Sequence, residues 1–108
     1  MALTRDFKET VQARVKQDAA FRKALLREGI ECFLCGDVET GKTLLRDFIN
    51  ATIGFTKLGR AMGRSPKSLM RMLSPTGNPQ AKNLFEIVAL LQRREGLRFT
   101  VRSSARAA

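Results

Sequence analysis

Three side-chain types that carry much of enzyme chemistry and aromatic packing are missing from this 108-residue chain, which contains no histidine, no tyrosine and no tryptophan. Without histidine, a serine–histidine triad, a histidine general base and most zinc hydrolase sites are excluded. No apolar run approaches the roughly 20 residues that span a bilayer, and the first residues lack the apolar core of a signal peptide. The missing signal peptide predicts a cytoplasmic protein. We further expect no enzymatic activity, no cofactor or metal ion and no membrane partner.

Acidic residues are scarce in one half of the chain. Twenty Lys and Arg stand against ten Asp and Glu, a net charge of +10. Residues 1–53 carry nine basic and eight acidic side chains, a net of +1, whereas residues 54–108 carry eleven basic and two acidic ones, a net of +9. Because such an excess repels itself, it favours a polyanionic partner. A membrane surface is the competing polyanion, but a basic membrane anchor needs bulky apolar residues beside its charges, so nucleic acid is favoured.

Helical periodicity dominates the first half. Apolar residues spaced four apart predict a helix over 4–16, with Thr4 or Asp6 as its N-cap. A second helix is expected after an N-cap at Asp18, and Gly29 would break or bend it.

Turn residues divide the second half into short segments. We expect helices over 56–62, 65–73 and 80–94, a loop over 74–79 and a strand over 97–102. Since a lone strand leaves its backbone unpaired, this strand would require either a second copy of the chain or a different partner.

One run, Gly36–Thr43, matches the phosphate-binding loop pattern G-x-x-x-x-G-K-[ST] letter for letter. In a nucleotide-binding protein Lys42 would reach the terminal phosphates. The pattern has this meaning only between a buried strand and a helix of a parallel sheet; residues 30–35 pass for such a strand, but no apolar strand ending in an acid follows. The favoured interpretation is a helix-ending Gly36, an N-cap at Asp37 for a third helix and an exposed Lys42. A small nucleotide-binding protein is the alternative.

Two cysteines, Cys32 and Cys35, form a C-x-x-C pair. A zinc site needs four ligands, and one chain without histidine or a third cysteine cannot supply them, although a dimer would pool four thiolates. A thioredoxin-like motif requires the pair at a helix start after a strand. We therefore interpret the pair as two small apolar residues on one helix face, in their reduced form.

Residues 55–73 predict two short helices joined by a turn. Leu58 and Leu69 would pack the helices together where they cross. Residue 59 must be small because the second helix passes close to it, and Gly63 must adopt a left-handed conformation.

The second helix of this pair presents a basic face. Ser65 and Pro66 would begin it as N-cap and first residue. Lys67 and Arg71 would then lie one turn apart on an exposed face, which fits a DNA major groove. A helix hairpin with a solvated basic face is the competing interpretation.

Residues 38–101 resemble the addiction-module antidote proteins, which are HigA-like antitoxins with a lambda-repressor-like (XRE-type) helix-turn-helix. The resemblance is carried by 44–58, 63–74, 77–79 and 83–87, and the Ser-Pro-x-Gly-Asn-Pro loop before an apolar helix is its most specific part.

The resemblance implies an all-α, lambda-repressor-like helix-turn-helix domain over 37–102 that ends in a short strand. Residues 1–36 would form an extension of two helices, and residues 103–108 a flexible tail. The resemblance also implies a homodimeric antitoxin that represses its own operator on double-stranded DNA and neutralises a RelE/ParE-like toxin. The usual residue at position 59 is alanine; Gly59 fits the contact but lowers helix propensity.

On the family pattern, base contacts fall on the second helix of the pair and phosphate contacts on the segments around it. The implied base contacts are Lys67, Arg71, Ser65 and Ser68, and the implied phosphate contacts are Thr56, Lys57, Asn78 and Gln80. The predicted function is sequence-specific DNA binding by a transcriptional regulator. A protein-interaction module that does not bind DNA is the alternative.

Overall fold

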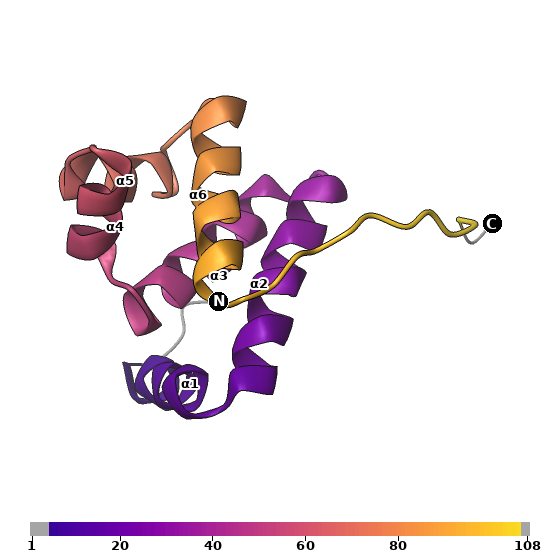
Figure 1. Ribbon diagram of the computed structural model, residues 1–108, viewed down its shortest axis with the longest axis horizontal. Helices are drawn as coiled ribbons and strands as arrows, with labels where there is room; N and C mark the ends of the chain where they lie inside the picture. Colours follow the sequence, from indigo (N-terminus) through magenta and orange to yellow (C-terminus); the bar gives the residue numbers. More distant parts are fainter. Residues whose placement is uncertain (1–4, 107–108) are drawn as a thin grey trace.

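The computed structural model describes residues 5–106, with side chains from residue 9 onward. Within this part of the chain the protein is all-α, with six helices and no strand (Figure 1). The helices are α1 (Arg5–Gln17), α2 (Ala19–Leu34), α3 (Val38–Ala51), α4 (Phe55–Met62), α5 (Pro66–Met72) and α6 (Ala81–Arg94).

Short polar side chains and glycines set the helix ends where the sequence predicts them. Asp18, Asp37 and Ser65 each accept a hydrogen bond, at 3.1 to 3.2 Å, from the backbone N–H three residues further on. These N-caps satisfy donors that the helix itself leaves unpaired. Gly36 and Gly63 follow the ends of α2 and α4 with φ angles of +86° and +67°, a conformation that glycine adopts without a steric cost.

Two details of the N-terminal helices differ from expectation. Because α1 begins at Arg5, Asp6 lies inside its first turn and not at the cap; Thr4 lies outside the described residues. Helix α2 also continues through Gly29 instead of breaking there. Gly29 is buried, and a Cβ built on it would lie 3.5 Å from the Leu44 Cβ, so contact with α3 supports the helix at its weakest residue.

The strand predicted over 97–102 is absent from the single chain. The Phe99 N–H donates to Oε1 of Gln92 at 2.8 Å, and the Phe99 ring packs against the core. Beyond it the segment leaves the body on the side away from α4 and α5 (Figure 1), and the Val101 side chain is 82% exposed. A strand requires a neighbouring strand to pair with its backbone, and residues 5–106 of one chain offer none.

A single hydrophobic cluster joins all six helices, so α1 and α2 pack into the same core as the rest. Arg22 reinforces this connection because its Nε binds Oε1 of Glu95 at 2.5 Å and its Nη1 donates to the Val15 carbonyl at 3.0 Å. The buried apolar residues are Val15, Leu25, Leu26, Leu45, Phe48, Ile49, Ala51, Ile53, Phe55, Leu58, Leu69, Leu73, Ile87, Val88 and Leu91.

The turn between α4 and α5 passes close to Gly59. The Arg64 N–H donates to the Gly59 carbonyl at 2.9 Å, and a Cβ built on Gly59 would lie 2.5 Å from the Arg64 carbonyl oxygen. The prediction that residue 59 must be small is confirmed. Even an alanine at this position would require the turn to move.

We predict opposite effects for the same substitution at two helical glycines. Gly29→Ala should raise the free energy of unfolding by about 0.5–1 kcal/mol, because alanine favours the helix and meets only ordinary contacts. Gly59→Ala should lower it by about 1–3 kcal/mol, because its Cβ overlaps a backbone carbonyl. Urea unfolding of both variants measures the difference, and an equal gain in stability at both positions would contradict the close approach at Gly59.

Candidate nucleic-acid interface

The exposed face of α5 is set by the residues that it buries. Leu69 and Leu73 are fully buried, so the opposite side of the helix faces solvent. At about 100° per residue, Lys67 and Arg71 lie about 40° apart on that opposite side. Both side chains are exposed, and neither forms a hydrogen bond or ion pair within residues 9–106. The structure therefore places two free cations one helical turn apart.

The other predicted contact residues surround this face. Ser65 is exposed at the N-cap of α5 and Ser68 is half-buried in its first turn. The residues predicted to contact phosphate, in the first turn of α4 and just before α6, are all exposed: Thr56, Lys57, Asn78 and Gln80.

Three of the predicted contact residues share one surface hollow of about 330 Å³. Ser68 and Arg71 line it from α5, and Asn78 lines it from the loop that leads to α6. Thr56 and Lys57 are not among its lining residues. The structure therefore brings together a predicted base contact and a predicted phosphate contact that are seven residues apart in the sequence.

The residue that holds this loop in place is Lys42, which the sequence interpretation expected to be exposed. That expectation is wrong, since Lys42 is only 2% exposed. Its Nζ donates to the carbonyls of Ser74 at 2.9 Å and Gly77 at 2.8 Å, and it pairs with Oε2 of Glu39 at 3.0 Å. A buried ammonium is stable only with such partners. Because Lys42 belongs to α3 and its carbonyl partners belong to the loop, this buried charge joins the two segments.

A signal for this burial is present in the sequence. Lys42 lies three residues before Leu45 and seven before Ile49, which places it on the apolar stripe of α3. A cation on a buried stripe needs acceptors from another element, and a loop rich in proline and glycine provides free carbonyls.

Two more contacts fix the loop against the end of α5. Arg46 of α3 donates from Nη1 to the Leu73 carbonyl at 3.1 Å. Gly77 lies so close to α5 that a Cβ on it would overlap the carbonyl oxygens of Arg71 and Met72. Cations at a helix C-terminus satisfy carbonyls that the helix leaves unpaired and complement its dipole. Arg46 has this role at the C-cap of α5, while Lys42 holds the loop that follows.

The same geometry bears on the phosphate-loop pattern. Residues 30–35 are helical rather than a strand, up to the C-cap at Cys35, and Nζ of Lys42 is engaged by the loop of residues 74–77. Gly36 and Asp37 have the cap roles that the sequence predicts. Neither the strand nor the free lysine that a phosphate-binding loop needs is present in this stretch.

The cysteine pair lies at the end of α2 with both thiols free. Cys32 is half-buried and Cys35 is exposed. Burial raises the pKa of the Cys32 thiol, and nearby acidic groups, Asp37 first among them, raise it further. Cys32 is therefore a weaker nucleophile at neutral pH than an ordinary cysteine. Within the described residues no three His, Cys, Asp or Glu side chains gather as metal ligands.

Comparison with known proteins adds no relative. The chain matches no protein-family model, no curated protein and no solved structure. None of the helices within residues 5–106 combines the length and the apolar content needed to cross a membrane.

We predict that Lys42→Met lowers the free energy of unfolding by about 1.5–3 kcal/mol, because methionine fills the space but leaves the loop carbonyls without a donor. Glu39→Gln is the matched control. Its side chain is 66% exposed, so its loss should stay within about 0.5 kcal/mol. Urea unfolding compares the two variants, and equal effects would show that the pair with Glu39, not the loop carbonyls, stabilises Lys42.

Proposed function

We propose that this protein binds double-stranded DNA sequence-specifically through α5 and acts as a homodimeric transcriptional regulator, without catalysis. The observation that carries the proposal is the pair formed by Lys67 and Arg71. Both are exposed, free of partners within residues 9–106, and borne on a helix whose other face is buried. Such a helix fits the major groove, where Arg and Lys donate to O6 and N7 of guanine.

The surrounding residues support a docked helix. Ser65 and Ser68 lie beside the two cations and would add base contacts. The half of the chain that contains α4, α5 and α6 carries the net charge of +9, which suits the phosphate backbone. The phosphate contacts in this proposal are Thr56 and Lys57 on one side of α5, and Asn78 and Gln80 on the other.

In its finer form, the proposal takes α4 and α5 as a lambda-repressor-like helix-turn-helix. Two observations support this part of the proposal: Gly63 makes the turn between the helices, and Leu58 of α4 is buried in the core. The resemblance of the sequence then suggests an antitoxin that represses its own operator and neutralises a RelE/ParE-like toxin. The segment 97–102 would become a strand only on pairing with a second copy or with that partner.

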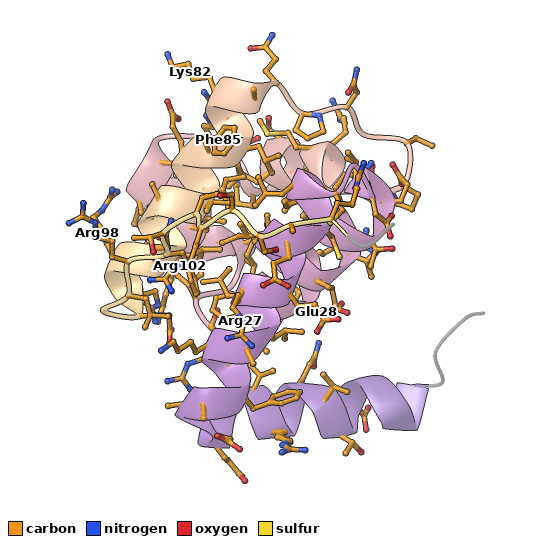
Figure 2. All side chains as sticks on the ribbon, turned by 90° about the vertical axis from the view of Figure 1, so that its right-hand side faces the viewer. Arg27, Glu28, Lys82, Phe85, Arg98 and Arg102 are labelled. Atoms are coloured by element: carbon orange, nitrogen blue, oxygen red, sulfur yellow. The ribbon has the colours of Figure 1, made fainter. Side chains whose placement is uncertain are left out.

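One feature favours protein interaction as a second candidate function. A hollow of about 200 Å³ lies between α2 and the C-terminal segment, and its apolar lining includes Ile30, Leu34, Phe99 and Val101. Figure 2 shows this face, with Arg102 beside it. It is a different surface from α5, so a protein partner and DNA are compatible.

We predict that Arg71→Ala weakens binding to the preferred duplex by about 1–3 kcal/mol and relaxes specificity at one base position. The preferred duplex is obtained by selection from a random-sequence pool and its affinity is measured by fluorescence anisotropy. Arg102→Ala is the control that removes the same charge from the C-terminal segment (Figure 2), and it should leave specificity unchanged. Equal losses for both variants on selected and random duplexes would contradict base reading by Arg71.

We predict a different signature for Lys57→Ala. A lysine that contacts only phosphate should weaken binding to every sequence equally and should reduce the slope of log K against log salt concentration by about 1. Titrations between low and moderate salt measure the slope for the variant and for the wild type. An unchanged slope would place Lys57 outside the interface.

A further inference from the structure

One large apolar side chain on α5 is not explained by the fold. Met70 is 46% exposed, although the buried face of the helix is filled by Leu69 and Leu73. At about 100° per residue, Met70 lies about 60° from Lys67 on the side away from Arg71. Met70 is therefore at the edge of the outward face, with Lys67 about 60° to one side of it and the buried Leu73 about 60° to the other.

Exposed large apolar residues are few on this molecule. Within the described residues they are Leu34, Val38, Met70, Phe85 and Val101. Met70 is the one on the α4–α5 pair. The others lie on α2, α3, α6 and the C-terminal segment, and Figure 2 shows Phe85 on α6 at the face that carries that segment.

The floor of the major groove offers one apolar group, the 5-methyl of thymine. A methionine side chain suits it because the unbranched thioether is flexible and polarisable. Lys67 and Arg71 would donate hydrogen bonds to the bases beside it, whereas Met70 has no polar hydrogen to donate. The three residues together would read two hydrogen-bonding positions and one methyl position.

We propose that Met70 is a specificity-determining residue that packs against the 5-methyl group of a thymine next to the bases contacted by Lys67 and Arg71. This inference rests on the proposed function, because it requires α5 to lie in the major groove. It adds a base preference that the polar residues of α5 do not supply.

The experiment removes the methyl group from the DNA and the apolar side chain from the protein. In the selected duplex, each thymine of one half-site is replaced in turn by deoxyuridine, which lacks only the 5-methyl group. One replacement should weaken wild-type binding about fourfold, the factor that corresponds to one buried methyl group. Met70→Gln, a polar variant of similar size, should bind more weakly and should not respond to that replacement.

A second variant and a stability measurement separate the loss of the thymine contact from a general loss of folding. Met70→Leu should retain the response to deoxyuridine, because leucine is also apolar. Met70 is exposed, so all three proteins should show the same unfolding midpoint in urea. A Met70→Gln variant that responds to deoxyuridine as the wild type does would overturn the proposal, as would a wild type that responds at no thymine.

Failure of the proposed function is distinguishable from failure of this inference. If the wild type selects no duplex at all, the proposed DNA binding itself fails and the Met70 proposal falls with it. If the wild type selects a duplex but Met70→Gln changes only the oligomeric state in sedimentation, Met70 lies between protein copies and the thymine contact is overturned.

Discussion

The burial of one ammonium group, that of Lys42, determines how the surface of α5 is presented. Its partners are backbone carbonyls of the loop after α5 and a carboxylate one turn before it on α3. Removing the donor would leave those carbonyls unsatisfied, so this charge and the conformation of the loop depend on each other. Arg46 and the close approach of Gly77 fix the same junction. The position of Asn78 relative to Arg71 follows from these contacts.

The charges of the two halves of the chain also differ in what they contact. Residues 1–53, which contain α1 to α3, carry almost balanced charges and use two of their cations, Lys42 and Arg46, to hold the loop. The second half carries the excess, and its cations on α5 have no intramolecular partner within residues 9–106. The C-terminal segment leaves on the far side of the molecule from α4 and α5 (Figure 1). The α4–α5 pair and the C-terminal segment thus present two surfaces that face different ways.

Local signals in the sequence were sufficient for most of the helices and for the caps of α2, α3 and α5, because an N-cap such as Asp37 or a left-handed Gly63 is decided by neighbouring residues. The exposed positions of α5 also followed from local spacing. Interactions between distant elements were not predictable in this way: the carbonyls that bind Lys42 are 32 and 35 residues away. Helix α2 passes through Gly29 because α3 packs against it. Apolar and polar residues alternate over 97–102 as they do in a strand, but this pattern does not show whether a second strand is present to pair with it.

The most direct test of this account is to follow the backbone amide signals of the isotopically labelled protein by NMR while the selected duplex is added. The account predicts that the shifts concentrate in the first turn of α4, in α5 and in residues 78–82, with α1 and α2 unaffected. Shifts confined to α2 and the C-terminal segment, with the amides of α5 unchanged, would contradict it.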